Sequence, residues 1–212
     1  MDEIVQAALK KWPNVPHCFG WLALDARGTW RMRDERCQAL NLRGDAIRNQ
    51  TLAGFINRNY LVDERGRWYF QNGPQRVYVD LETAPYIVHT THDRGLVFHT
   101  DESVNAVNTF FITQAGQLLL QAGDRFAQVD DRDLATCFAG LKRDGHAATD
   151  EEVAGLLDSG AVGQNDMQHF SIDMHFGQDG LRSARLKRGE LADLMQAYGY
   201  NARPRQENAN EV

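Results

Sequence analysis

The stretch GWLALDARGTWRM, residues 20 to 32, reads as two short strands joined by a tight turn. Asp25 lies where the first residue of a type I turn accepts a backbone N–H, and Gly28 lies where the chain needs a positive φ. These features predict a three-residue hairpin loop with a glycine bulge. Counting outward from the turn places four apolar residues on one face of the hairpin, with Leu24 opposite Trp30 and Leu22 opposite Met32.

The same kind of turn recurs along the chain. Four further segments that end in glycine predict hairpins at DERG (63–66), HDRG (92–95), TQAG (113–116) and GQDG (177–180). The predicted apolar pairs are Val62 with Trp68, Tyr60 with Phe70, Ile112 with Leu118, Phe110 with Leu120, and Met174 with Ala184. The recurrence indicates a repeated hairpin-and-helix unit, and chance recurrence of a common turn is the alternative.

Helical spacing of apolar residues separates the hairpins. The predicted helices cover residues 2–11, 46–59, 130–142, 149–160 and 189–200. Thr149 and Glu152 have the spacing of a capping box at the start of one of them. The expected fold is therefore α+β, with antiparallel β-hairpins interleaved with helices in two similar sub-domains.

The sub-domains are expected to divide the chain unequally. The N-terminal α+β part is predicted to cover residues 1–84 and the C-terminal α+β part residues 85–200. Residues 201–212, NARPRQENANEV, are too polar to pack, so they are predicted to form a flexible tail.

Composition narrows the function classes. Apolar residues make up 42% of the 212-residue chain and charged residues 25%, which is typical of a globular protein. No apolar run approaches the ~20 residues that span a bilayer, so no membrane partner is expected. The three cysteines form no disulfide or zinc pattern, which favours a cytoplasmic location. The net charge of -6 disfavours nucleic acid as a partner.

The third predicted hairpin carries the candidate ligand-binding residues. Its register places His89 directly opposite His99, with Asp101 on the same face. Two imidazoles and a carboxylate can bind a divalent metal, an anion or a proton in transit. The competing interpretation is the solvated face of a half-buried sheet, because polar residues alternate on such a face.

Other candidate chemistry is weaker. His169, Asp173 and His175 are interpreted as part of a polar outer face, and Cys137 as a packed helix residue. The helix at 46–59 followed by a hairpin has the order of a DNA-recognition helix and wing, but the preceding helix is missing. The chain has no Gly-x-Ser-x-Gly elbow and no phosphate-binding glycine loop, so no catalytic residues are assigned and a non-enzyme is expected.

Three stretches carry a resemblance to a known family: WPNVPHCFGWLALDARGTWRMRDE, GFINRNY and GRWYFQNGPQRVYVDLETAPYIV. With them the chain resembles an uncharacterised bacterial, specifically proteobacterial, family of unknown function and similar length. The order of its motifs, ending in LVFHTDE, is similar to a second unknown-function family of repeated α+β motifs. That second resemblance implies two α+β parts and a signalling or regulatory role, and neither resemblance supplies catalytic residues.

These observations favour a regulatory or signalling module that binds a small ligand or a protein partner. One alternative is a metal-dependent enzyme that uses the His/His/Asp face of His89, His99 and Asp101. The other is a structural homo-oligomer formed through edge strands. No cofactor can be named from the sequence.

Overall fold

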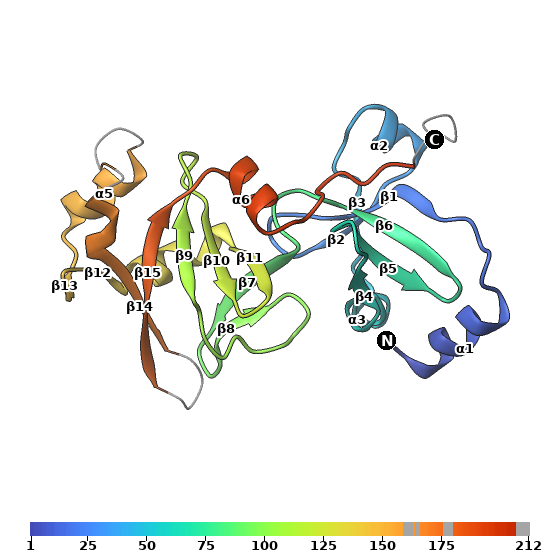
Figure 1. The fold of residues 1–212 in the computed structure, drawn as a ribbon, viewed down its shortest axis with the longest axis horizontal. Coiled ribbons are helices and arrows are strands. Elements are labelled where there is room, and N and C mark those ends of the chain that lie inside the picture. The colour runs from blue at the N-terminus through green and yellow to red at the C-terminus, as the bar shows by residue number, and fades with distance from the viewer. Residues whose placement is uncertain (159–162, 164–165, 176–179, 207–212) are drawn as a thin grey trace. The chain divides into compact units, whose positions relative to one another are not determined.

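The computed structural model describes residues 1–158, 163, 166–175 and 180–206 (Figure 1). The chain divides into two compact units. The first comprises Met1–Pro85 and Gly199–Val212, and the second comprises Tyr86–Tyr198. Each unit contains its own β-sheet, so the fold is α+β with two sheet-bearing parts. Within the described ranges, no helix is both long and apolar enough to cross a bilayer.

In its described residues, the first unit forms a six-stranded sheet with the strand order β3-β2-β1-β6-β5-β4. Its elements are α1 (Glu3–Lys11), β1 (Cys18–Leu24), β2 (Trp30–Met32), α2 (Glu35–Ala39), β3 (Asp45–Ala46), α3 (Gln50–Arg58), β4 (Tyr60–Val62), β5 (Trp68–Asn72) and β6 (Gln75–Leu81). The buried apolar side chains of β1 and β6, which lie side by side, form the centre of its core.

The first two predicted hairpins are confirmed. The observed pairs are Leu24 with Trp30, Leu22 with Met32, Val62 with Trp68, and Tyr60 with Phe70. In the first turn the Asp25 carboxylate accepts two backbone N–H groups at 3.0 and 2.8 Å, and Asp63 accepts the equivalent two at 3.0 Å each. Met32 and Val62, at the last positions of their strands, stay about half exposed. The turns fix the register, and most of the apolar face is buried.

The described residues of the second unit form a nine-stranded sheet with the order β13-β12-β14-β15-β9-β10-β11-β7-β8. Its strands are β7 (Tyr86–Thr91), β8 (Gly95–Phe98), β9 (Thr109–Ile112), β10 (Leu118–Ala122), β11 (Arg125–Val129), β12 (Leu141–Arg143), β13 (His146–Ala147), β14 (Phe170–His175) and β15 (Leu181–Arg188). Its helices are η1 (Asp131–Asp133), α4 (Leu134–Phe138), α5 (Asp150–Leu157), η2 (Asp166–His169) and α6 (Leu191–Ala197).

Both sheets are mixed, because each adds parallel strand pairs to the predicted antiparallel hairpins. The hairpins themselves are antiparallel, but β1 pairs in parallel with β6, β7 with β11, and β9 with β15. In each unit the first strand of a hairpin pairs with the last strand of a three-strand meander, β4-β5-β6 or β9-β10-β11. The sequence prediction missed these parallel pairs because a turn signal reports only strands that are neighbours in the chain.

Two predicted hairpin registers are wrong. In the third hairpin Thr91 pairs with Gly95, so His89 lies opposite Val97 instead of His99. The reason lies in the turn, where the Thr91 hydroxyl accepts the backbone N–H of Arg94 at 3.2 Å and so takes the role of the first turn residue. In the fifth hairpin Met174 pairs with Arg182 and Ile172 with Ala184, and the predicted turn at 177–179 lies outside the described residues. The fourth hairpin has the predicted pairs.

Helix boundaries also differ from the prediction at one place that shapes the first unit. The helix expected from residue 46 begins at Gln50, because Asp45–Ala46 form β3 and the Asn49 side chain caps the helix by accepting the backbone N–H of Leu52 at 3.0 Å. The capping box of Thr149 is present as predicted.

Residues 201–206 are not a loose tail, which corrects the sequence expectation. The backbone N–H of Leu81 donates to the carbonyl oxygen of Ala202 at 2.8 Å, and Asn201 donates to Gly66 at 2.9 Å. The Tyr200 hydroxyl, on a buried ring, donates to the Thr83 carbonyl oxygen at 3.0 Å. The segment 199–206 therefore packs on the first unit, and the rest of the predicted tail, 207–212, lies outside the described residues.

Candidate functional site

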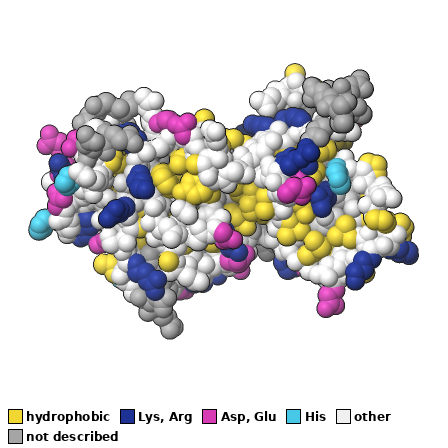
Figure 2. Space-filling model, in the orientation of Figure 1, with side chains coloured by type: hydrophobic (Ala, Val, Ile, Leu, Met, Phe, Trp, Pro, Cys, Tyr) yellow, Lys and Arg dark blue, Asp and Glu magenta, His cyan; other side chains and the backbone are white. Residues whose placement is uncertain are grey.

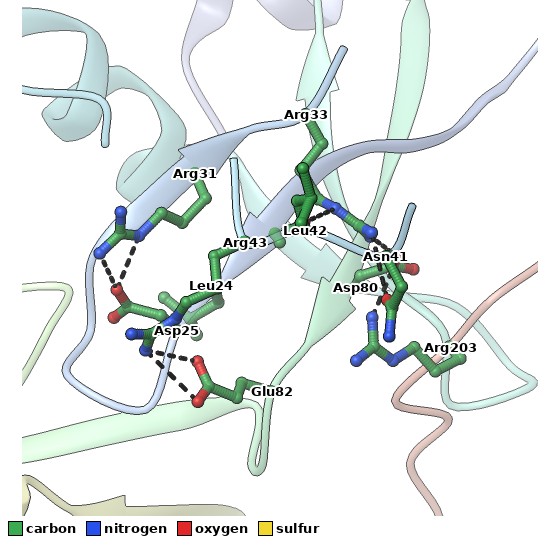
Figure 3. Close-up of a pocket in the computed structure, with 11 residues that line it drawn as sticks. Leu24, Asp25, Arg31, Arg33, Asn41, Leu42, Arg43, Asp80, Glu82 and Arg203 are labelled. Atoms are coloured by element: carbon green, nitrogen blue, oxygen red, sulfur yellow. Dashed lines mark hydrogen bonds and ion pairs between the residues drawn. The ribbon is translucent and has the colours of Figure 1, made fainter. Parts of the chain in front are cut away.

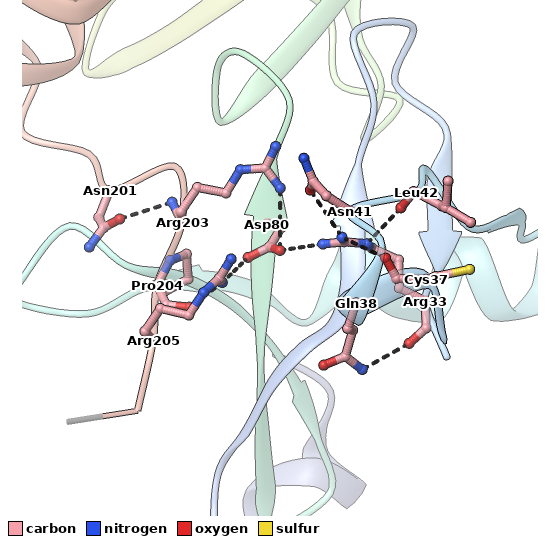
Figure 4. A network of polar contacts seen from close by, with 10 residues as sticks. All are labelled: Arg33, Cys37, Gln38, Asn41, Leu42, Asp80, Asn201, Arg203, Pro204 and Arg205. Carbon is pink, nitrogen blue, oxygen red and sulfur yellow. Dashed lines mark hydrogen bonds and ion pairs between the residues drawn. The ribbon is translucent and has the colours of Figure 1, made fainter. Parts of the chain in front are cut away.

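The first unit buries a carboxylate among three arginines (Figure 4). Asp80 on β6 has no solvent exposure. Arg33 lies 2.5 Å from its carboxylate, Arg205 2.7 Å and Arg203 3.4 Å. Arg33 follows β2, whereas Arg203 and Arg205 belong to the C-terminal segment 199–206. Two parts of the chain far apart in sequence are thus joined through one buried acid.

Arg33 is nearly as buried as its partner, with 4% of its side chain exposed. Its backbone N–H donates to the carbonyl oxygen of Trp21 at 2.8 Å, which extends the hairpin pairing by one residue. Its guanidinium donates to the carbonyl oxygens of Leu42 at 3.0 Å and Cys37 at 3.3 Å. The amide oxygen of Asn41 accepts a further bond at 3.4 Å. Helix α2 and the loop after it therefore fold around this guanidinium and hold it in place.

A cavity of about 390 Å³ opens beside the buried pair (Figure 3). Two further ion pairs lie in its wall, Arg31 with Asp25 at 2.8 Å and Arg43 with Glu82 at 3.1 Å. The cavity is lined by residues of β1, β2, the loop after α2, the end of β6 and the C-terminal segment: Ala23, Leu24, Asp25, Arg31, Arg33, Asn41, Leu42, Arg43, Asp80, Glu82 and Arg203.

The ion pairs of the wall differ in how firmly they are held. Arg31 donates to Asp25 through both Nε and Nη2, and Asp25 is 3% exposed. Arg43 and Glu82 are 62% and 42% exposed, and such a surface pair contributes about 0 to 1 kcal/mol. Breaking a buried pair by removing one partner costs about 3 to 5 kcal/mol. The pairs with the buried acids Asp25 and Asp80 are therefore held firmly. The exposed pair of Arg43 with Glu82 can break at low cost in free energy.

Sequence reasoning missed this site. One signal was available, because Asp80 is an acid inside the otherwise apolar run VYVDL, residues 77–81. Arg203 and Arg205 gave no signal, since they lie 123 and 125 residues from Asp80 in a segment that reads as polar tail.

The structure does not bring His89 and His99 into the predicted pair. His99 follows β8, and its backbone N–H donates to the carbonyl oxygen of Ile87 at 2.7 Å. Its imidazole is buried, and Nδ1 accepts the backbone N–H of Ile87 at 3.3 Å. Burial lowers the pKa of His99 to about 3, so the ring is neutral at pH 7.

Asp101 has a different environment from His99. Its side chain is 81% exposed, and its carboxylate accepts a bond from Arg94 at 2.6 Å, which lowers the pKa of Asp101. In the part of the chain that the structure describes, no group of three or more His, Cys, Asp or Glu side chains is arranged to hold a metal ion. Ligand binding by His89, His99 and Asp101 stays a prediction.

Asp173, His175 and Cys137 have the predicted surroundings. On β14, Asp173 and His175 alternate with the buried Ile172 and Met174, as expected of a polar outer face. Both polar residues also line a cavity of about 470 Å³ in the second unit. Cys137 is buried in α4, and burial raises the pKa of its thiol to about 12, so the reactive thiolate is scarce.

The fold and the cavity define an α+β protein with two mixed sheets and an arginine-walled site in its first unit. The chain belongs to the family DUF2944, described as "Protein of unknown function (DUF2946)", with a match over residues 1–205. It is also similar to the crystal structure of a DUF1285 family protein from Silicibacter pomeroyi, with 15% identity and a TM-score of 0.42 over 73% of this chain and 99% of that chain. No curated protein matches the chain. The resemblance to families of unknown function is confirmed.

Proposed function

We propose that this protein is a regulatory module that binds a small ligand in the cavity of its first unit. The observation that carries the proposal is the cavity itself, about 390 Å³ in volume and walled by ion pairs that a buried acid anchors. Sites of this size accept small metabolites. The three cysteines are free, which fits a reducing cytoplasm as the place of action.

The wall favours binding over catalysis. Its arginines keep their charge throughout the physiological pH range, so they cannot act as bases. Each of its three carboxylates already has an arginine partner: Asp25 with Arg31, Asp80 with Arg33, and Glu82 with Arg43. Groups of this kind orient a charged ligand and have little capacity to move protons. A role in sensing or signalling, where a ligand shifts a conformational equilibrium, agrees with this chemistry.

The two units also support a repeated motif as part of the proposal. Residues 60–79 and 110–129 correspond without a gap, strand for strand and turn for turn. In both, a glutamine side chain donates to the carbonyl oxygen two residues on: Gln71 at 2.9 Å and Gln121 at 3.2 Å. We infer one ancestral sheet motif present twice.

The two units differ in the segment that joins the hairpin to the meander. Residues 33–49, which contain α2 and β3, lie between the hairpin of the first unit and α3 and supply part of the cavity wall. The second unit joins its hairpin to its meander through residues 99–108, all of them described and none in a helix. Ligand binding is therefore assigned to the first unit.

A cavity-filling variant tests the proposal. Leu42 lines the cavity and is 45% exposed, so Leu42→Trp fills the mouth with little cost to folding. Leu40, 60% exposed and outside the lining, gives the matched control Leu40→Trp. A library of metabolites is screened by thermal shift. A ligand at about 100 times its Kd adds about 2.7 kcal/mol of stability, which raises Tm by several degrees.

We expect at least one compound to raise the Tm of the wild type and of Leu40→Trp but not that of Leu42→Trp. The proposal fails if no compound raises the wild-type Tm. It also fails if the shifts in Leu42→Trp equal those of the wild type.

A further inference from the structure

We infer that the ligand of this cavity is a phosphate monoester of a polyhydroxy compound, with its phosphate held between Arg43 and Arg203. The inference rests on the proposed function, because it names the ligand class of the same cavity. Three observations support it: the positive charge of the wall, the exposure of Arg43 and Arg203, and the hydrogen-bonding groups beside them.

The wall has an excess of positive charge. Four arginines and three carboxylates line the cavity, and Arg205 adds a further positive charge on Asp80. The chain as a whole carries a net charge of -6, so this local excess is opposite in sign to the rest of the molecule. On the face shown in Figure 2, Lys and Arg side chains are interspersed with Asp and Glu. The charge of the wall therefore selects an anion.

Arg203 can leave its partner at low cost. Its contact with Asp80 is 3.4 Å long, and 48% of its side chain is exposed. Asp80 keeps two closer partners, Arg33 at 2.5 Å and Arg205 at 2.7 Å, so the buried carboxylate stays neutralised when Arg203 turns to a ligand. Arg203 is thus available to an anion without exposing a buried charge.

Arg43 is available for a similar reason. In the wall it forms an ion pair with Glu82, and the two side chains are 62% and 42% exposed. An exposed pair of this kind contributes little stability, whereas a guanidinium binds a phosphate through two charge-assisted hydrogen bonds. Arg31 and Arg33, by contrast, are held by buried acids and stay in the wall.

Two guanidinium groups call for a ligand with two negative charges, which a phosphate monoester carries near pH 7. When Arg43 turns to the phosphate, the Oε1 atom of Glu82 loses its arginine partner, while Oε2 still accepts the backbone N–H of Ala26 at 3.2 Å. The Asn41 side chain lies in the same wall. Hydroxyl groups on the ligand can form hydrogen bonds with both the Glu82 carboxylate and the Asn41 amide. No aromatic ring is among the described lining residues, so the wall offers no stacking partner for a base. A sugar phosphate fits these groups better than a nucleotide does.

Isothermal titration calorimetry with ribose 5-phosphate tests the inference. We expect binding to the wild type, and at least tenfold weaker binding to Arg43→Gln and to Arg203→Gln, a loss of about 1.4 kcal/mol or more. Arg36→Gln is the matched control, because Arg36 is an exposed arginine of the same unit that does not line the cavity. Its affinity should stay within about twofold of the wild type. Ribose without phosphate should show no measurable binding.

The inference would be overturned by unchanged affinity in both Arg43→Gln and Arg203→Gln, by binding of ribose as tight as that of ribose 5-phosphate, or by tighter binding of adenosine monophosphate. Absence of ribose 5-phosphate binding would also overturn it. If ribose 5-phosphate does not bind but a compound from the metabolite screen raises the Tm of the wild type and not that of Leu42→Trp, the proposed function stands and only the ligand class is wrong. Thermal unfolding of each variant shows that it is folded before its affinity is compared.

Discussion

Asp80 joins segments of the first unit that lie far apart in the sequence. Its partner Arg33 is almost fully buried, so the charge of Arg33 is tolerated because Asp80 is present. Asp80→Asn leaves the Arg33 guanidinium buried without its counter-charge. We expect the free energy of unfolding to fall by about 3 kcal/mol or more, measured by urea denaturation.

Glu82→Gln is the control for this loss. It removes a carboxylate from the same cavity wall, but from a pair that is largely exposed, so about 1 kcal/mol or less should be lost. Equal losses in the two variants would mean that burial of Asp80 has no energetic consequence, and the account of the anchor would be wrong.

His99 gives the second unit a pH dependence. Burial lowers its pKa from 6.5 to about 3, so the unfolded chain binds the proton more tightly than the folded chain does. The stability due to the neutral imidazole is fully present above pH 6.5 and is lost as the pH falls from 6.5 towards 3. We expect His99 to account for a loss of about 1 to 2 kcal/mol between pH 7 and pH 5.

His99→Asn tests this expectation, because an amide oxygen can still accept the backbone N–H of Ile87 while the titration is removed. Urea denaturation at pH 7 and pH 5 should show a smaller loss in the variant than in the wild type. An identical pH dependence in both proteins would show that His99 is not the titrating group.

At the scale of single elements, the hairpins were predictable because their information is local. Asp25 and Asp63 accept backbone N–H groups inside their own turns, so a four-residue pattern is enough to set the register. The register of the third hairpin was not predictable from the same pattern. There Thr91, one residue before the predicted first turn residue His92, accepts the backbone N–H inside the turn. In the correctly predicted fourth hairpin Thr113 has the same role, since its hydroxyl accepts the backbone N–H of Gln117 at 3.1 Å. A first turn residue whose side-chain oxygen accepts a backbone N–H is therefore the informative part of the motif.

Matched glycines in two of these turns test the packing of the C-terminal segment. Gly66 and Gly116 have the same turn position, with φ of 70° and 76°. A Cβ on Gly66 would lie 1.9 Å from the carbonyl oxygen of Gly199, whereas a Cβ on Gly116 would meet only Leu157, at 3.8 Å. Gly116→Ala should therefore cost only the backbone strain, about 1 to 2 kcal/mol.

Gly66→Ala should cost more than Gly116→Ala in urea denaturation, because segment 199–206 must also move. The backbone N–H of Asn201, which donates to Gly66, should exchange with solvent faster in Gly66→Ala and at an unchanged rate in Gly116→Ala. Unchanged exchange at Asn201 in both variants would contradict the docking of the segment.

At the scale of the whole molecule, the sequence predicted the fold class and not the site. Hairpins and capped helices are determined by short stretches of sequence. The parallel pairing of β1 with β6 and the contact of Asp80 with Arg203 depend on residues that lie far apart in the chain. The cavity exists only when both have formed. A segment that looks too polar to pack supplies two of the three arginines on the buried acid.

The most direct test of the account is a crystal structure of the protein with the compound that gives the largest thermal shift. We predict ligand density in the cavity of the first unit, within hydrogen-bond distance of Arg43 and Arg203. Ligand density elsewhere, for example in the cavity beside Asp173 in the second unit, with the first cavity empty, would contradict it.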